Sequence, residues 1–355
     1  MKKGMKKLSL LLCVILIVSI CFTGCGNNNG DDAEAQDVYT LNACNLVPET
    51  DPIHMGMAYL KDLLEEKTDG RIKVEIYGNK SVSNSNDEEA QLVADGTTIQ
   101  FTTTPAYVLA AMNESLVNFY VYDMPYLFDS YEEMYNWADT SEEYAKMQQD
   151  CIAATGIKPY GTTPIGWCLV STAKKPIEDI NSFKGQKIRT SSSDLTMTLI
   201  NNIGANATPV AWGETFTAIQ QGTVDGMYTA STLYASERYY EVVKYCAALK
   251  ATTIPHTPIL NNAWYEKLPD DLKVIFDECM DEYIAYFRGV NEQKDAEACA
   301  TMEENGCKVV EFTDAQLQEF KDAEASMYET KAELIGGKDF LKSVQDFVAE
   351  YKSTK

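Results

Sequence analysis

The chain has 355 residues and a formal net charge of −23, with 53 acidic against 30 basic side chains. This acidic balance argues against a nucleic-acid partner, and the length allows two lobes that each have a core. Because the field of the whole protein repels anions, an anionic ligand would need a local cation to hold it.

The first two dozen residues have the pattern of a leader peptide. Four lysines, at positions 2, 3, 6 and 7, precede an apolar run from Leu8 to Phe22 that is short for a membrane span. Thr23 and Gly24 then precede Cys25, the layout of a bacterial lipoprotein cleavage site. We predict a signal peptide over 1–24, a lipid on Cys25 and a flexible, solvated tether over 25–37. The alternative is an ordinary secretory signal beside an unrelated cysteine.

Strand and helix patterns alternate in the next part of the chain. A strand over 39–44 precedes a helical apolar stripe over 53–68, and a strand with one solvent-exposed face follows over 71–77. Ser85 begins a helix that runs to Ala94, with acidic residues at the positive end of its dipole, and another strand follows over 99–103. This order predicts an α/β lobe with a largely parallel sheet.

The alternation restarts after residue 159. The expected elements are strands over 167–171 and 186–190, helices over 195–203 and 214–221, a short strand after Gly226, a long charged helix from Asp270 to about Glu304, and a polar helical tail beyond Thr313. The predicted fold class is therefore α/β, with two lobes, a hinge and a long helix that crosses both. Lobe I would comprise 38–163 with about 255–295, and lobe II 164–254 with about 296–355. A ligand would lie in the cleft, at the carboxyl ends of the strands.

The cysteines indicate neither a metal site nor a full set of disulfides. Seven remain beyond Cys25, namely Cys44, Cys151, Cys168, Cys246, Cys279, Cys299 and Cys307. They form no C-x-x-C pair, and the chain has two histidines, so a zinc site is not expected. Seven thiols cannot all pair, so we expect buried free thiols, with one disulfide left open. No cofactor is expected.

One arginine has the context of an anion-binding residue. The other three, Arg71, Arg238 and Arg288, lie in an amphipathic strand, a charged and aromatic run, and a charged helix. Arg189 ends a strand that reads as buried, and Ser191 to Asp194 after it form a helix N-terminus. A guanidinium beside free backbone N–H groups is suited to a carboxylate. A structural ion pair with Asp194 or Glu214 is the alternative.

Five segments share motifs with one protein family. They are 65–74 (EEKTDGRIKV), 95–97 (DGT), 123–128 (DMPYLF), 183–189 (FKGQKIR) and 204–226 (GANATPVAWGETFTAIQQGTVDG). In this order they resemble the solute-binding subunits of tripartite ATP-independent (TRAP) transporters, which include C4-dicarboxylate and sialic acid receptors. The resemblance implies a bilobal, type II-like periplasmic-binding-protein fold. It also implies a receptor, and not an enzyme, that delivers a small organic acid to integral membrane permease subunits.

The resemblance also implies ligand-binding positions. The carboxylate-binding arginine of the family corresponds to Arg189, its pocket aromatic residue to Trp212, and an asparagine to Thr229. Asn45 corresponds to an asparagine that contacts ligand in the sialic acid branch. Where some members have a second arginine, this chain has Cys168.

These departures indicate the kind of ligand. A dicarboxylate held at both ends would need two cations, and the second is missing here. Trp167, Trp212 and Tyr228 instead favour an aromatic or bulky apolar body attached to one carboxylate, unless the tryptophans belong to the core. Thr104, in the run 102–104, is expected to line the cleft from the first lobe.

Nothing in the sequence assembles catalytic chemistry. It lacks the G-x-S-x-G, H-E-x-x-H, phosphate-loop and EF-hand patterns. His54 and His256 lie beside prolines and are expected to be hydrogen-bonding loop residues. We predict a monomeric receptor, lipid-anchored on the outer face of the cell membrane (in the periplasm if Gram-negative), that captures its ligand by closing. An ABC-type substrate-binding lipoprotein is the first alternative, and a secreted hydrolase or adhesin the second.

Overall fold

The computed structural model describes residues 37–355. The predicted signal peptide, Cys25 and all of the predicted tether except Asp37 lie outside the described residues. The first elements are β1 (Tyr39–Cys44), α1 (Pro52–Lys67), β2 (Ile72–Tyr77), α2 (Asn86–Asp95), β3 (Phe101–Pro105), α3 (Ala106–Met112), the 3-10 helix η1 (Glu114–Asp123), α4 (Tyr131–Thr140), α5 (Glu142–Thr155) and β4 (Ile157–Pro159).

The rest of the chain contains further elements. They are β5 (Thr163–Thr172), η2 (Ile180–Phe183), β6 (Lys187–Thr190), α6 (Asp194–Asn202), β7 (Asn206–Pro209), α7 (Trp212–Gln220), β8 (Gly226–Ala230), α8 (Ser231–Ser236), η3 (Tyr239–Glu241), β9 (Tyr245–Asn261), α9 (Asn262–Tyr265), α10 (Asp270–Glu304), β10 (Lys308–Val310), α11 (Asp314–Glu324), α12 (Met327–Thr330), η4 (Ala332–Ile335) and α13 (Lys338–Ser353). The predicted elements are all present, with β5 beginning earlier than expected. The sequence patterns do not predict α3, α4, α5 or the longest strand, β9.

The strands form one continuous sheet in the order β2-β1-β3-β9-β5-β8-β6-β7, with β4 and β10 also paired to β9. At one end β1 is parallel to β2 and β3, and at the other end β6 is parallel to β7 and β8. The parallel pairing predicted for these strands is confirmed. Between the two parallel groups, β9 runs antiparallel to β3 and β5, and β5 runs antiparallel to β8.

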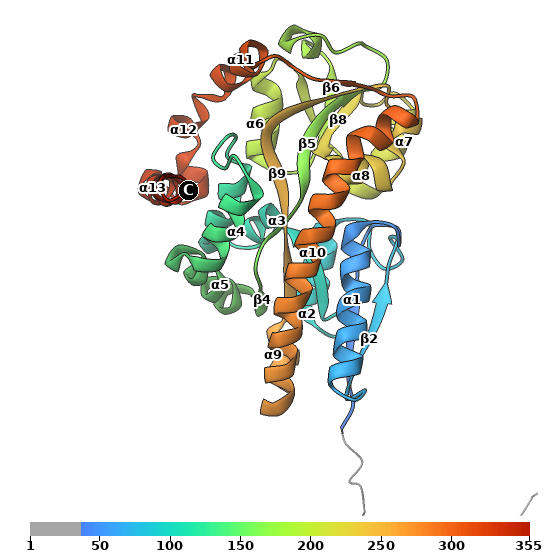
Figure 1. Ribbon diagram of the computed structural model, residues 1–355, viewed down its shortest axis with the longest axis vertical. Coiled ribbons are helices and arrows are strands. Elements are labelled where there is room, and N and C mark those ends of the chain that lie inside the picture. The colour runs from blue at the N-terminus through green and yellow to red at the C-terminus, as the bar shows by residue number, and fades with distance from the viewer. Residues whose placement is uncertain (1–36) are drawn as a thin grey trace, which may run out of the picture. The chain divides into compact units, whose positions relative to one another are not determined.

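Strand β9 connects the two groups. It is 17 residues long and passes through both the upper and lower parts of the ribbon in Figure 1. Its side chains alternate between two core clusters, with Ala247 and Ile259 in one and Cys246 and Leu260 in the other. Because neighbouring residues of a strand point to opposite faces, the two clusters lie on opposite faces of the sheet.

Helix α10 also passes through both parts (Figure 1). It has 35 residues, and its buried stripe includes the predicted Phe276, Cys279 and Tyr283. It packs against α1, where a Cβ added to Gly56 would lie 3.1 Å from the Tyr283 ring. A residue without a side chain therefore allows the two helices to approach closely.

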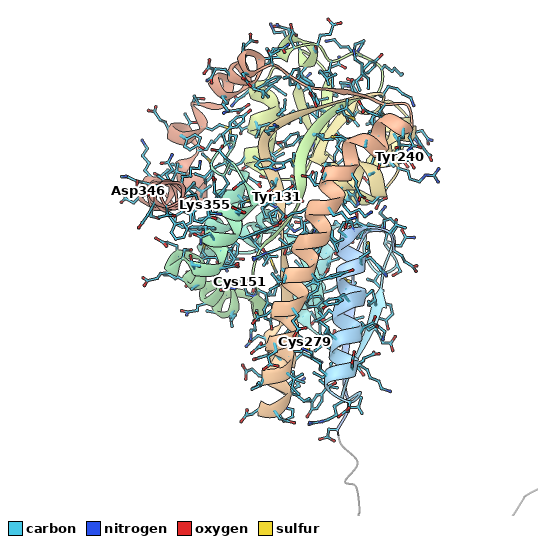
Figure 2. All side chains as sticks on the ribbon, in the orientation of Figure 1. Tyr131, Cys151, Tyr240, Cys279, Asp346 and Lys355 are labelled. Atoms are coloured by element: carbon cyan, nitrogen blue, oxygen red, sulfur yellow. The ribbon has the colours of Figure 1, made fainter. Side chains whose placement is uncertain are left out.

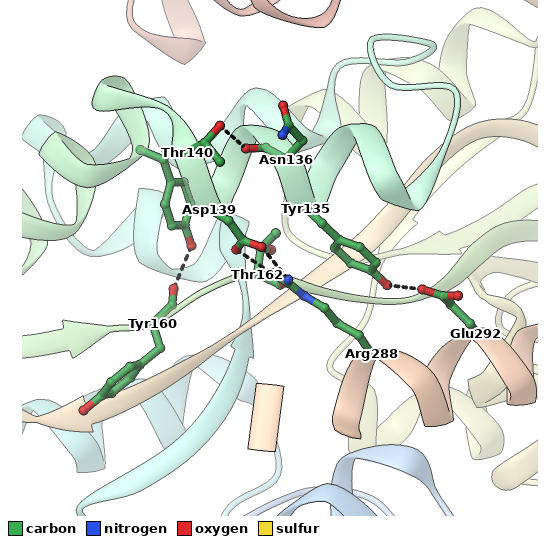
Figure 3. Close-up of polar contacts among 9 residues, drawn as sticks. Tyr135, Asn136, Asp139, Thr140, Tyr160, Thr162, Arg288 and Glu292 are labelled. Carbon is green, nitrogen blue, oxygen red and sulfur yellow. Dashed lines mark hydrogen bonds and ion pairs between the residues drawn. The ribbon is translucent and has the colours of Figure 1, made fainter. Parts of the chain in front are cut away.

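An arginine clamp fixes α10 to α4 (Figure 3). Arg288 donates two hydrogen bonds to the Asp139 carboxylate, at 2.6 and 2.7 Å, and two more to the Thr162 carbonyl oxygen, at 3.1 and 2.9 Å. Its guanidinium also lies 4.2 Å from the centre of the Tyr135 ring. The planar fork therefore holds a helix, the start of β5 and an aromatic ring at once.

Replacing Arg288 by lysine is expected to lower the free energy of unfolding by about 1 kcal/mol, because an ammonium group cannot donate in a fork to Asp139 and Thr162 together. Urea denaturation would measure the change. Arg238→Lys, at an exposed pair with Glu241, serves as the control and should leave stability unchanged. Equal stabilities of the two variants would contradict a role of the clamp in holding α10.

Candidate ligand-binding site

Most of the predicted site residues meet around one cavity. It contains about 720 Å³ of space not filled by atoms, part of it open to solvent, which is in the range of small-molecule sites. On one side lie the segment after β1, α2 and β3, and on the other β6, the start of α7, and β8. The cavity therefore lies where parallel strands of both groups end, as predicted. Of the predicted residues, it is lined by Asn45, Cys168, Arg189, Trp212, Tyr228 and Thr229.

Arg189, near the end of β6, is 5% exposed and provides the only Lys or Arg side chain among the lining residues of this cavity within 37–355. Its Nε donates to the Val210 carbonyl oxygen at 3.0 Å. Throughout residues 37–355 its guanidinium makes no ion pair and no second hydrogen bond, so the alternative pairing with Asp194 or Glu214 is not formed. Burial lowers the pKa of Arg189 from its usual value. A buried, unpaired guanidinium strongly favours an anion beside it.

Aromatic and neutral side chains surround the guanidinium. The centre of the Trp212 ring lies 5.4 Å from the Arg189 guanidinium and 5.5 Å from the Tyr239 ring. The Tyr228 hydroxyl lies 2.8 Å from the Thr252 hydroxyl. Burial raises the pKa of Cys168 to about 12, so this residue presents a neutral thiol. This wall thus combines one cation with flat, largely apolar surface.

Neutral polar side chains form part of the opposite wall. Asn45 follows β1, where its amide lies 3.3 Å from His54 Nδ1. The Thr103 hydroxyl lies 3.3 Å from His256 Nδ1. His256 is not a loop residue as predicted, because it belongs to β9 and pairs with Pro105 and Thr163. Burial lowers the pKa of His256 to about 3, so its ring is neutral.

Two predicted site residues lie away from this cavity. Trp167 stacks on Tyr131 of α4 at 5.7 Å and lines a different hollow (Figure 2 labels Tyr131). It neighbours Cys168 on β5, and adjacent strand residues face opposite sides. Thr104 is fully buried beside Thr103, and its hydroxyl has no partner within 37–355. The same alternation turns Thr104 away from the cavity that Thr103 lines.

Two buried carboxyl groups in the cavity wall are absent from the sequence-based prediction. Asp123 accepts hydrogen bonds from Ser193 and, at 3.5 Å, from Thr196, and burial raises the pKa of Asp123 to about 6. Glu89 is 1% exposed, and burial raises the pKa of Glu89 to about 7. One pattern could have revealed Glu89: it lies four residues before buried Val93 on α2, so it faces the core side of that helix.

Two contacts between residues outside the cavity lining join the elements of its two sides. Asp51, at the start of α1, accepts a hydrogen bond from Ser236 of α8 at 2.6 Å. Lys80 forms an ion pair with Glu237 at 3.0 Å. Both contacts link the β1–β2 region to the segment after β8.

A family model for bacterial extracellular solute-binding protein, family 7, matches residues 44–333. The chain belongs to this family. It is the TRAP receptor family indicated by the five motifs, and that prediction is confirmed. Since members of family 7 bind solutes outside the cytoplasm, this chain is an extracytoplasmic solute-binding receptor and not an enzyme.

Relatives and solved structures agree with this assignment. The C4-dicarboxylate-binding periplasmic protein DctP of Rhodobacter capsulatus is 24% identical over 306 residues, covering 86% of this chain and 89% of that protein. The sugar acid binding protein DctPAm of Advenella mimigardefordensis, solved with galactonate, has a TM-score of 0.83 at 21% identity and covers 88% of this chain and 99% of that one. A TRAP solute-binding protein of Desulfovibrio salexigens, solved with orotic acid, has a TM-score of 0.79 at 22% identity, with coverage of 88% and 99%. The predicted bilobal, periplasmic-binding-protein-like fold is confirmed.

Three further findings concern the cysteines of the family 7 receptor, its possible metal ligands and its helices. All seven cysteines within residues 37–355 are free thiols, six of them buried and Cys299 partly buried. In the same residues no three His, Cys, Asp or Glu side chains are grouped as metal ligands. Among the helices of this part of the chain, none combines the length and apolar character that a membrane span requires.

Proposed function

We propose that this receptor binds a small organic acid through a single carboxylate held by Arg189 and delivers it to a TRAP permease. The observation that carries the proposal is the lone buried guanidinium in the cavity wall, which has no anionic partner in residues 37–355. The related proteins named above bind a C4-dicarboxylate, galactonate and orotic acid, and all of these are acids.

The cavity supports a monocarboxylate in preference to a dicarboxylate. Cys168 presents a neutral thiol where some family members have a second arginine, so a second carboxylate would lack a cation. Trp212 offers ring surface next to Arg189, and Tyr228 lines the same cavity, which suits an aromatic or apolar body. Trp167 adds nothing to this wall, so the two other rings carry the argument.

A thermal-shift screen of the purified receptor tests the ligand class. We expect aryl monocarboxylates to raise Tm by more than succinate or malate, because at equal concentration the ligand that binds the folded state more tightly stabilises it more. Stronger stabilisation by succinate or malate would refute the monocarboxylate proposal.

Capture would proceed by closure of two lobes. The proposed division is 38–163 with about 255–295, and 164–254 with about 296–355. The pairing of β3 with one end of β9, and of β5 with β8, supports this division. Helix α13 is an exception, because this division assigns it to the second lobe while it packs against α4 of the first. A ligand that contacts both walls would favour the closed state.

The leader pattern supports lipid anchoring at Cys25 on the outer face of the cell membrane. We expect the receptor to be a monomer that meets its permease there. Replacing Cys25 by serine is expected to abolish the incorporation of labelled fatty acid into the receptor, because the thiol that would carry the acyl chains is missing. Metabolic labelling followed by immunoprecipitation would show the change. Labelling of the variant at the level of the parent would contradict lipid attachment at this residue.

A further inference from the structure

Glu89 is a buried carboxyl group in the wall of the ligand cavity. It lies on α2, while Arg189 lies on β6, and Figure 1 shows these elements in the lower and upper parts of the fold. The two residues therefore belong to opposite walls. A ligand held at Arg189 can extend towards Glu89.

Three neutral groups of the protein donate hydrogen bonds to Glu89: the hydroxyls of Ser83 and Thr102, and the thiol of Cys44, which is a weak donor. The Ser83 hydroxyl lies 3.2 Å from Oε1, and the Thr102 hydroxyl lies 3.2 Å from Oε2. The Thr102 hydroxyl can donate only one hydrogen bond. Its oxygen lies closer, at 2.8 Å, to the Cys44 carbonyl oxygen, which can only accept. When Thr102 donates to that carbonyl, Oε2 receives no hydrogen bond from it. No cation lies within 4.0 Å of Glu89 in residues 37–355.

The other acid of the cavity differs in this respect. Asp123 accepts from both Ser193 and Thr196, which belong to the N-terminal region of α6. His256 is neutral and lies against Thr103. Glu89 is thus a carboxyl acceptor in this wall with capacity left for a ligand donor, because a carboxylate can accept about four hydrogen bonds.

We propose that Glu89 determines specificity by selecting organic acids that carry a hydrogen-bond donor, a hydroxyl or an ammonium group, at the end remote from the carboxylate. The inference rests on the proposed function, since Arg189 fixes the carboxylate end. A donor-free acid would leave a buried acceptor unpaired, and such groups are costly to bury. A site that forms hydrogen bonds with a ligand donor rejects the analogue that lacks it.

The test uses two matched series of acids. One consists of phenylacetate, 4-hydroxyphenylacetate and 4-(aminomethyl)phenylacetate, and the other of butanoate, 4-hydroxybutanoate and 4-aminobutanoate. Calorimetry with the wild-type receptor should give a Kd for the donor-bearing acid that is about 10- to 100-fold lower than for its donor-free parent.

Two variants separate the donor types. Glu89→Leu should abolish the difference within a series. Glu89→Gln keeps an acceptor oxygen and removes the charge, so it should retain the preference for the hydroxyl acid and lose about 10-fold for the ammonium acid. Glu324→Gln changes a buried carboxyl outside the cavity and should bind as the wild type does.

The outcomes distinguish this inference from the proposed function. Donor-free acids that bind the wild type as tightly as their partners, or a preference that survives in Glu89→Leu, would overturn the role of Glu89 alone. If Glu89→Leu fails to fold, the wild-type comparison and the Glu89→Gln variant still decide. If no acid of either series binds the wild type, both proposals fail.

Discussion

Replacing Arg189 by alanine is expected to weaken binding of the acid by about 2–5 kcal/mol, or roughly 30-fold or more in Kd. The variant removes the one cation that residues 37–355 place in the cavity wall, and it leaves the ligand carboxylate desolvated without a partner. Isothermal titration calorimetry with the best acid from the thermal-shift screen would measure the loss.

Two further variants make this result specific. Arg189→Lys should bind with intermediate affinity, because an ammonium group keeps the charge but not the planar fork. Arg238→Ala removes an exposed arginine that pairs with Glu241 outside the cavity, and its affinity should equal that of the wild type. If Arg189→Ala retains the parent's affinity, the proposed cavity is not where the acid binds.

The ligand-free receptor is expected to lose about 2 kcal/mol of its unfolding free energy as the pH rises from 6.5 to 8. Burial raises the pKa of Glu324 to about 8 and that of Glu89 to about 7, from ordinary values near 4.5. Over this range the unfolded chain has released both protons while the native state still binds them, so the native state loses stability as the pH rises. His256, whose pKa is lowered to about 3, contributes only below about pH 6.5.

Glu324→Gln isolates the contribution of Glu324, which is the larger of the two contributions to this pH dependence. Glu324 is 2% exposed, its Oε1 has no partner within 37–355, and Asn202 donates to Oε2 at 2.9 Å. The variant should be more stable than the parent at pH 8 and should lose most of the pH dependence. Glu319→Gln alters an exposed acid on the same helix and should keep the parent's slope. Urea melts across the pH range would check both, and parallel slopes for parent and Glu324→Gln would contradict this assignment.

Local patterns allowed the sequence to predict many elements closely. The long helix is observed over Asp270–Glu304, because its apolar stripe is continuous over many turns. Ser85 caps α2 by accepting from the Glu88 N–H, and Gly96 ends that helix with a φ of +67°. These features depend on residues close together in the chain, which is why they can be read from it.

Strand β9 shows where such patterns fail. Pro255 and Pro258 indicate a loop in the sequence, yet both lie inside the strand. Pro255 is paired with Pro164 of β5, next to a register irregularity. Neither residue has an N–H to donate, so the ladder tolerates prolines at the point where it is already interrupted. That arrangement depends on a strand almost a hundred residues away.

The site also contains residues that local motifs predict and residues that they do not. Arg189 and Trp212 could be predicted because their motifs are local and resemble those of a family. Strand faces could not be predicted at β5, where Cys168 points to the cavity and Trp167 to the other side. Glu89 was not predicted, because acidic residues at a helix start are usually explained by their favourable interaction with the helix dipole. Its burial depends on the packing of β1 and β3 over it.

The central strands β5 and β9 also determine how the molecule unfolds. Because β9 pairs with β3 of one parallel group and β5 pairs with β8 of the other, while β5 and β9 pair with each other, a fragment containing one group alone would lack the central ladder on which its own strands assemble. Neither half is therefore expected to fold when expressed separately. Calorimetry of the intact receptor should show one cooperative melting transition and not two.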